Sequence, residues 1–581
     1  MASVKSILSS RSTLTLVLLV IVGAVFFVNY RCIFDEKPDL NGDNIYYFSL
    51  AQSLYEGTGY SNTMGPELTP HMHFPPGYPV FMSMLMHIWP DNMHAMKVAN
   101  GVLLFLGLLI LFYLIVQATS SSLLAAAVCV LASCHAELLR WATMMMSEML
   151  YFFLTMAIIF IFTLIDYRQL FTRSAWKQWV YLVIGLILIA YTYFVRTMGI
   201  SLILATCIWV FSFAVVFLIK GLKSKTYEWP LIIKYTIVGI LILGSFMIAK
   251  TAWGIRNEKV VPGFQSDYIG DFLKKPEGEK MTTFNDWADR VKNNTKLYIT
   301  HDIPNAVFGN TKMTASGRWV LGISLLVLVI YGLACLGAIG YFMLLFVGIT
   351  FAVLLFWPEQ YGGIRYFIVT VPLLLLGLCS SIYDLVQTGI RSIWKKPWEI
   401  TSMTGVLILL GILIPRYIEA QTYYRQVAKS ECWQPITSPY NQQYIEAAEW
   451  CKQNLSKESV VMCRKPEIFY YYSQGLRTIS FSQYATIDEV MTLLEKKQPD
   501  YVLIDWGFKH AFATLYPAIE AHPEKFEFVC QWGECLPDQQ QATILFAYKT
   551  KKEVGRPLCD PAGARTQDPI LKRDVLYLLS Y

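Results

Sequence analysis

The chain has 581 residues, of which 55% are hydrophobic and 15% are charged, and its net charge is +6. A soluble globular domain carries roughly a quarter charged residues. The composition therefore excludes an ordinary soluble protein and indicates a protein embedded in a membrane. The positive charge falls mostly in connections between apolar segments, so we expect no nucleic-acid partner.

About eleven apolar segments approach the roughly 20 residues that a helix needs to cross a bilayer. They are centred near residues 12–30, 97–117, 121–134, 148–165, 178–194, 198–219, 231–252, 318–334, 336–356, 366–387 and 401–417. The count carries a margin of two, because segment 121–134 is short and residues 76–89 are apolar enough to enter the bilayer. The predicted fold class is a polytopic α-helical membrane protein.

Basic residues predict the orientation, because short cytoplasmic connections are rich in Lys and Arg. Lys5 and Arg11 precede the first segment and no small-residue cleavage site follows it, so it is predicted to be a retained signal anchor. Three connections on the side of the N-terminus contain Arg168, Arg173, Lys177, Lys220, Lys223, Lys225, Lys234, Arg391, Lys395 and Lys396. We expect a multi-pass protein of the bacterial cytoplasmic (inner) membrane, with a cytoplasmic N-terminus and an external C-terminal domain.

Hydropathy divides the chain into three parts. Residues 1–417 are predicted to form the membrane domain. Its predicted external loops are 31–96, 135–147 and 253–317. Residues 418–550 alternate between helix-like and strand-like stretches, which indicates a small external α/β domain. Residues 551–581 fit neither pattern and are expected to be a disordered tail.

The sequence of the predicted α/β domain contains no motif that marks it as nucleotide-binding. Residues 442–455 and 487–498 have a helical pattern, whereas 459–463 and 500–505 resemble strands. The domain lacks a glycine-rich phosphate loop. We interpret it as structural or acceptor-recruiting, with a second active site as the alternative. Its cysteines can form disulfides whose pairing the sequence does not determine: Cys432, Cys451, Cys463, Cys530 and Cys535.

The first external loop contains "NGDNIYYFSLAQSLYEGTGYSN", residues 41–62. Apolar and tyrosine residues recur at helical spacing, which predicts an amphipathic helix over 44–56 at the membrane interface. Asp43 stands directly before it, and two compatible interpretations apply: an N-cap or a carboxylate held rigidly for catalysis. The rival acids in this loop are Asp35, Glu36 and Asp39.

A proline-rich segment follows in the same loop. "PPGYP", residues 75–79, fixes several backbone angles at once. It is predicted to be a tight turn that leads into a helix over 80–89, a rigid wall beside a pocket, or both. Our candidates for the acceptor pocket are Tyr46, Tyr47, Pro76 and Tyr78.

A second acid and three arginines are predicted at the external face. Glu148 stands at the start of an apolar run, where an ionisable group is costly unless it is paired or functional. The alternative is helix capping, with Ser147 as the N-cap. The arginines at this face, where positive charge is least expected, are Arg196, Arg256 and Arg365. With Asp43, these residues predict an outward cavity whose guanidinium groups bind phosphate oxygens.

Histidines do not complete a metal site in this sequence. His71 with His73, and His135 with Glu137, each fall short of a ligand set. We assign no metal-binding residues, and a divalent cation stays open as a cofactor.

Taken in order, "GDNIYYFSLAQSLYEGTGY" with "PPGYP", then "SEM", "VRTMG", "WGIRN" and "IRYFIVTVP", resemble the GT-C integral-membrane glycosyltransferases. The similarity is to the protein O-mannosyltransferase-like branch that includes the lipid A aminoarabinose transferases, and it covers roughly residues 12–390. The family's first-loop acid corresponds best to Asp43. The family's Asp-Glu pair is Asp43-Asn44 here, whereas Asp35-Glu36 matches the dipeptide without the following helix.

The resemblance implies a donor sugar linked to polyprenyl phosphate, transferred to a hydroxyl of a glycan, lipid or protein acceptor. Asp43 would act as the general base. Arg256, Arg365 and Arg196 would stabilise the departing phosphate, and Glu148 would orient the acceptor or assist Asp43. Direct displacement would invert the anomeric centre. Membrane lipids would surround the protein and hold the donor.

Two other classes of function compete with this interpretation. A transporter or flippase for a lipid-linked glycan would place ionisable groups deep within spans and carry repeats of broken helices. A non-enzymatic scaffold would use the α/β domain as its working part. The sequence shows few charges in the middle of spans and no clear internal repeat, which favours the transferase.

Overall fold

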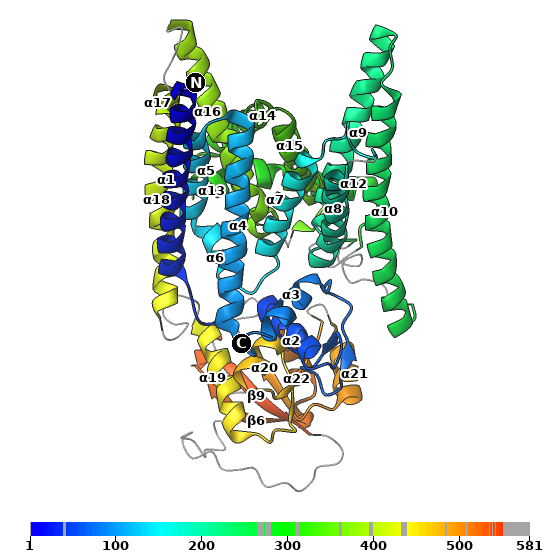
Figure 1. Cartoon of the computed structure of the whole chain (residues 1–581). Helices are drawn as coiled ribbons and strands as arrows, with labels where there is room; N and C mark the ends of the chain where they lie inside the picture. The colour runs from blue at the N-terminus through cyan, green and yellow to red at the C-terminus, as the bar shows by residue number, and fades with distance from the viewer. Residues whose placement is uncertain are drawn as a thin grey trace. The chain divides into compact units, whose positions relative to one another are not determined.

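The computed structural model is predominantly helical and divides into two compact units (Figure 1). Unit 1 comprises residues 1–34 and 72–425, and unit 2 comprises 35–71 and 426–581. The structure describes residues 2–38, 42–172, 175–263, 272–273, 280–309, 313–359, 363–393, 399–430, 439–482, 485–505, 509–533, 535–536, 539–540 and 542–549. The predicted tail 551–581 and the rival acid Asp39 lie outside these residues.

Unit 1 is a bundle of helices. Its elements are α1 (Ala2–Ile33), α3 (Gly77–Met86), α4 (Met93–Thr119), α5 (Ser122–Cys134), α6 (Ala136–Ala142), α7 (Glu148–Leu164), α8 (Trp176–Val195), α9 (Gly199–Ser224), α10 (Trp229–Val260), α12 (Phe284–Leu297), the π-helix η1 (Tyr298–Asp302), α13 (Ile303–Phe308), α14 (Ala315–Ala334), α15 (Gly337–Leu355), the 3-10 helix η3 (Ile364–Thr370), α16 (Val371–Ile393), α17 (Glu399–Ser402) and most of α18 (Thr404–Lys429).

Nine helices among the described residues are long and apolar enough to cross a membrane, or ten if the bent pair α5–α6 counts as one span. The fold class of a polytopic helical membrane protein is therefore confirmed, and the count is close to the eleven predicted. Two predicted spans differ in form. The 121–134 segment continues into α6 across a 68° bend, and α7, predicted as a span at 148–165, is a shorter apolar helix.

The surface of the bundle shows why these sequences require a membrane. In α10 only 22% of the most apolar window is buried, and Ile240 and Ile248 are 58% and 72% exposed. Such a helix would be unstable in water but is well solvated by lipid tails. Figure 1 shows α10 running beside α9, with which it packs.

Small residues let helices of unit 1 approach backbone to backbone. A Cβ atom added to Gly332 of α14 would lie 1.8 Å from the carbonyl oxygen of Gly377 in α16. The same addition at Gly377 would meet the carbonyl oxygen of Val329 at 2.8 Å. Membrane helices pack by van der Waals contact rather than by the hydrophobic effect, so glycines at such crossings stabilise the bundle.

Unit 2 is an α/β unit. Its elements are α2 (Asp43–Tyr55), β1 (Ser61–Asn62), β2 (Thr69–Pro70), α19 (Pro439–Asn454), β3 (Val460–Met462), α20 (Pro466–Tyr472), β4 (Arg477–Ile479), α21 (Ile487–Lys497), β5 (Tyr501–Ile504), α22 (Lys509–Ala521), the 3-10 helix η4 (Pro523–Lys525), β6 (Phe526–Trp532), β7 (Cys535–Leu536), β8 (Gln539–Gln540) and β9 (Thr543–Tyr548).

Five strands form the main sheet of unit 2 in the order β4-β3-β5-β9-β6. Strands β4, β3 and β5 are parallel, β9 is antiparallel to β5, and β6 is antiparallel to β9. Apolar side chains cover both faces of this sheet, in one cluster with α21 and α22 and in another with α19 and α20. The small C-terminal α/β region predicted from the alternating pattern is therefore present.

Part of the first predicted external loop, residues 35–71, packs into unit 2. Ile45 of α2 and Met64 share a buried cluster with Phe469 and Leu503. The backbone N–H of Thr478 in β4 donates to the carbonyl oxygen of Met64 at 2.8 Å, which covers that edge of the sheet. Contacts thus group residues 35–71 with the C-terminal sheet, although hydropathy assigned them to the membrane domain.

Helix α2 is less amphipathic than predicted. Of its 13 residues the eight buried ones are Asn44, Ile45, Tyr47, Phe48, Ser49, Leu50, Ala51 and Ser53. These buried residues lie on more than one face of the helix. Packing on several sides, rather than a single apolar stripe, therefore holds α2 in place. The helix also begins one residue earlier than predicted, at Asp43, with Gly42 as its N-cap.

Candidate functional site

A buried ion-pair cluster joins three helix ends in unit 1. Glu148 is the first residue of α7, Arg196 directly follows α8, and Arg365 is the second residue of η3. The Glu148 side chain is fully buried, and its Oε1 lies 2.8 Å from Nη1 of Arg196 and 3.0 Å from Nε of Arg365. Burying a lone carboxylate costs several kcal/mol, so the two guanidinium groups are what make this position tolerable.

Neighbouring side chains fix the two arginines further. Arg196 donates from Nη1 to Oγ of Ser147 at 3.2 Å. The guanidinium carbon of Arg365 lies 5.4 Å from the ring centroid of Trp141, within the range of a cation–π contact. Ser147 does occupy the N-cap position of α7, as the capping alternative predicted, but its side chain makes no cap hydrogen bond and its hydroxyl accepts from Arg196.

The cluster has a composition suited to binding an anion. Its three charged members, Glu148, Arg196 and Arg365, carry a net charge of +1. Each guanidinium has five N–H donors in a fixed plane, and Glu148 contacts Nη1 of Arg196 and Nε of Arg365. Among the described residues nothing hydrogen-bonds Oε2 of Glu148, so this oxygen is a buried acceptor with no partner. A carboxylate that positions two guanidinium forks can orient them for phosphate oxygens.

Asp43 is the first residue of α2 and belongs to unit 2. Gly42 precedes it with φ +84°, a backbone conformation that favours glycine. The N-cap interpretation of Asp43 is therefore wrong by one position. Asp43 is half-buried, whereas Asn44, where the family's pair has its second acid, is completely buried.

A buried carboxylate that the sequence did not identify lies against this helix start. Glu467, the second residue of α20, occupies the space where a Cβ on Gly42 would stand, 2.0 Å from that position to Oε1. Burial raises the pKa of Glu467, and the charge of Asp43 raises it further. Lys465, whose Nζ lies 3.7 Å from Oε1, opposes this increase in pKa. Hydropathy and motif patterns along the sequence cannot predict a contact between residues more than 400 positions apart.

The predicted acceptor residues occupy two different units. In unit 2, Tyr46 packs its ring 5.1 Å from that of His71, and Tyr47 is buried. In unit 1, Pro76 is the N-cap of α3. Tyr78 of α3 is completely buried, and its hydroxyl accepts a hydrogen bond from Nδ2 of Asn100 at 3.0 Å. Tyr78 is thus a packing residue in the structure.

Arg256 and Asp35 have local contacts. Arg256 lies near the end of α10, donates from Nη1 to Oδ1 of Asn257 at 2.9 Å, and stacks 5.1 Å from the ring of Trp253. Asp35 pairs with Lys37 at 2.8 Å. Of the three predicted arginines, the structure therefore brings Arg196 and Arg365 to Glu148.

The cysteines and candidate metal ligands among the described residues form no second centre. Cys451, Cys463 and Cys530 of unit 2 are free thiols. Within the part of the chain that the structure describes, no three His, Cys, Asp or Glu side chains gather as a metal site.

The fold is the one seen in solved GT-C membrane proteins, as the sequence resemblance predicted. No protein-family model and no curated protein sequence matches the chain. Solved structures do match it, and two proteins represent them.

The first is the oligosaccharyltransferase AglB from Archaeoglobus fulgidus, in complex with an inhibitory peptide and a dolichol-phosphate. It matches with a TM-score of 0.54 at 15% identity, over 93% of this chain and 75% of that one. The second is ArnT from Cupriavidus metallidurans. Its apo structure matches with a TM-score of 0.55 at 10% identity, over 93% and 98% of the two chains. Its complex with undecaprenyl phosphate gives 0.53 at 11%, over 92% and 98%.

Proposed function

We propose that the chain is a membrane glycosyltransferase that moves a sugar from a polyprenyl-phosphate-linked donor to an acceptor hydroxyl at the external face, with inversion. The observation that carries the proposal is the Glu148 carboxylate buried between Arg196 and Arg365. Structures of the same fold bind dolichol-phosphate and undecaprenyl phosphate, which supports a lipid phosphate as the donor's leaving group.

In this mechanism the guanidinium groups stabilise negative charge that grows on the departing phosphate. Glu148 holds them in place, a positioning role that differs from the acceptor-orienting role predicted from the sequence. It is buried too completely to serve well as a base for a bulky acceptor. Such preorganised charge is the largest single contribution to the rate enhancement of many enzymes, because the charged groups need not rearrange during the reaction.

Asp43 is our proposed general base. It is half-buried at a rigid helix start, so its carboxylate has a defined position and some access to solvent. It would accept the proton of the acceptor hydroxyl while the acceptor oxygen bonds to the anomeric carbon and the bond to phosphate breaks. A positioned base contributes about 10²–10⁴-fold to the rate.

The position of the cluster also distinguishes a transferase from a transporter. Ion-coupled transporters place ionisable groups near the middle of the membrane, often at broken helices. Glu148, Arg196 and Arg365 instead lie at the ends of α7, α8 and η3. This arrangement favours surface chemistry over passage through the bundle.

Sugar transfer by the purified chain in nanodiscs, supplied with a radiolabelled polyprenyl-phosphate sugar and a glycan acceptor, tests the proposal. Asp43→Asn should lower turnover about 10²–10⁴-fold. Asp35→Asn, in the same loop but paired with Lys37, is the matched control and should retain turnover. Near-full activity of Asp43→Asn would remove it as the base.

The same assay tests the arginine cluster. Arg365→Gln should lower kcat about 10²–10³-fold, the usual loss for one preorganised donor. Arg168→Gln, which removes an exposed ion pair with Glu228, should leave kcat unchanged. In proteoliposomes, carriage of the lipid-phosphate sugar across the membrane without sugar transfer would support the transporter instead.

A further inference from the structure

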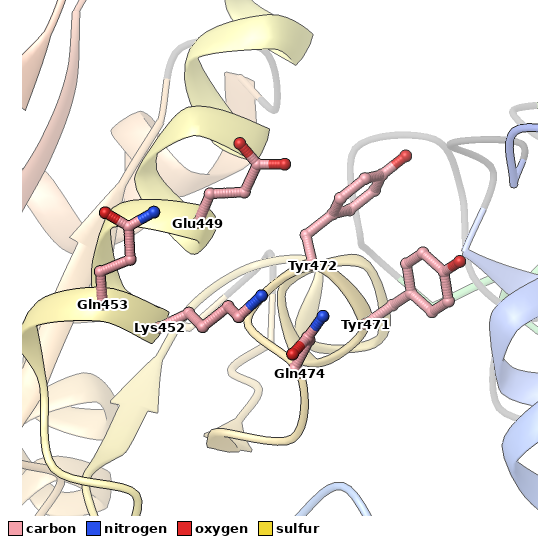
Figure 2. Close-up of a pocket in the computed structure, with 6 residues that line it drawn as sticks. All are labelled: Glu449, Lys452, Gln453, Tyr471, Tyr472 and Gln474. Carbon is pink, nitrogen blue, oxygen red and sulfur yellow. The ribbon is translucent and has the colours of Figure 1, made fainter.

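Unit 2 contains a pocket of about 550 Å³ between α19 and the end of α20 (Figure 2). Its lining residues are Glu449, Lys452, Gln453, Tyr471, Tyr472 and Gln474. Pockets for small molecules commonly measure 300–1,000 Å³. All of these residues belong to unit 2, whereas the ion-pair cluster around Glu148 belongs wholly to unit 1. The pocket therefore needs an explanation of its own.

One wall of the pocket is aromatic. Tyr471 and Tyr472 are the last two residues of α20, and both are half-buried. Their ring centroids are 5.1 Å apart and the rings meet at 89°. Two perpendicular rings offer a flat face and an edge to a ligand, together with two hydroxyl groups.

The facing wall is polar and comes from a single helix face. Glu449, Lys452 and Gln453 have i, i+3, i+4 spacing on α19, so they project on the same side. All three are exposed, and their side chains make no hydrogen bond or ion pair with any residue that the structure describes. Figure 2 shows Lys452 extending toward Gln474 and Tyr472. The charges of Glu449 and Lys452 cancel.

Gln474 contributes a side-chain amide to the pocket, and its own backbone has an unfavourable conformation. It follows the C-cap of α20 with φ +54°, and its N–H donates to the carbonyl oxygen of Tyr471 at 3.1 Å. A side chain in this left-handed region costs roughly 1–2 kcal/mol, which glycine avoids. Gln498 at the end of α21 has a similar φ of +45° but does not line the pocket.

We propose that this pocket binds an uncharged sugar unit of the acceptor glycan, an inference that rests on the proposed function. One face of a pyranose ring carries C–H groups that pack on an aromatic ring, while its hydroxyls both donate and accept hydrogen bonds. The tyrosine rings supply the first surface, and the amides, carboxylate and ammonium supply partners of both kinds. The balanced charge gives no preference for phosphate or sulfate, and the four polar side chains disfavour a lipid tail.

Binding of maltotetraose and mannotetraose to the full chain tests the proposal, by saturation-transfer NMR in nanodiscs free of sugar-headed detergent. We expect both or one of these probes to bind wild-type protein. Gln474→Gly removes the amide and relieves the backbone, so it should raise the dissociation constant about 5–10-fold without loss of stability. Gln498→Gly relieves the same strain elsewhere and should leave binding unchanged. Tyr472→Ala should weaken binding at least tenfold.

The outcomes separate this inference from the proposed function. Glu148→Gln should bind the tetrasaccharides normally while losing transfer. Transfer by wild-type protein with no binding of either sugar, or equal binding by wild type, Gln474→Gly and Tyr472→Ala, would overturn the pocket assignment alone. Preferential binding of a tetrapeptide would overturn the ligand class. Sugar binding without any transfer would contradict the proposed function and leave the pocket as a sugar site.

Discussion

Glu148 and Glu467 are both buried carboxylates, but their surroundings are opposite. Glu148 has two guanidinium groups within 3.0 Å of one oxygen. Glu467 has one ammonium at 3.7 Å, and the charge of Asp43 acts against its ionisation. The first carboxylate is stabilised in its charged form, because two opposite charges offset the loss of water. The second is destabilised when charged, because Lys465 and Arg464 offset only part of the cost of burial.

Glu467 therefore makes stability depend on pH. Its pKa in the folded protein is raised by burial, so with rising pH the unfolded chain loses this proton first. The contribution of Glu467 to stability should be greatest below about pH 4.3, the ordinary Glu pKa, and should be lost as pH rises through its raised folded-state pKa. Glu467→Gln should raise the midpoint of thermal unfolding at pH 7, and the gain should shrink toward pH 4.

Scanning fluorimetry of the full chain in detergent at both pH values measures this effect. Glu458→Gln serves as the control, because Glu458 is 80% exposed and pairs only loosely with Arg477 at 3.7 Å. Its substitution should change the midpoint little at either pH. A Glu467→Gln variant that is less stable than wild type at pH 7 would show that its contacts with Gly42 and Lys465 outweigh the burial of charge.

At the scale of helices, the crossing of α14 and α16 depends on glycine. Gly332→Ala would bring a Cβ atom to 1.8 Å from the backbone of Gly377, which flexible side chains cannot relieve. We expect a loss of about 1–3 kcal/mol from overpacking, measured as a lower unfolding midpoint in detergent. Gly348→Ala in α15 meets nothing within 4 Å, so it should be neutral or slightly stabilising. Equal midpoints for the two variants would contradict this account of the crossing.

Sequence patterns predicted most elements well, for identifiable reasons. Long apolar runs have one stable form in lipid, so the spans were evident from hydropathy alone. The alternation within 418–550 likewise indicated an α/β unit. Patterns gave the position of Ser147 at the N-cap of α7 but not the partner of its side chain, because its hydroxyl accepts from Arg196, 49 positions away. The pairing of Glu467 with the start of α2 was equally invisible.

At the scale of the whole molecule, the charges of unit 1 separate to opposite helix ends. Lys234 donates to the carbonyl oxygen of Arg168, and Arg168 pairs with Glu228, so these basic connections meet at one end. Helix α8 leads away from there to Arg196. Its 20 residues span roughly 30 Å, the thickness of a hydrocarbon core. By the positive-inside rule, the end that carries the basic connections is predicted to face the cytoplasm.

This separation predicts which loops face the cell exterior. A protease site inserted after Gly57 should be cut in intact spheroplasts, because the first loop is predicted to be external. A site inserted after Lys225, in the basic α9–α10 connection, should be cut only after the cells are opened. Immunoblotting of the fragments reads both results. Cleavage at Lys225 in intact spheroplasts would reverse the predicted orientation.

The edge contact between Met64 and Thr478 has a consequence for biosynthesis. During translation the segment that carries Asp43 leaves the ribosome hundreds of residues before the strand that completes its surroundings. Ile45 and Met64 must remain uncovered by unit 2 during that interval, so the proposed base acquires its setting only near the end of synthesis. Loss of the last 150 or so residues would then disable the first loop as well, although every membrane helix up to and including α18 would already be in place.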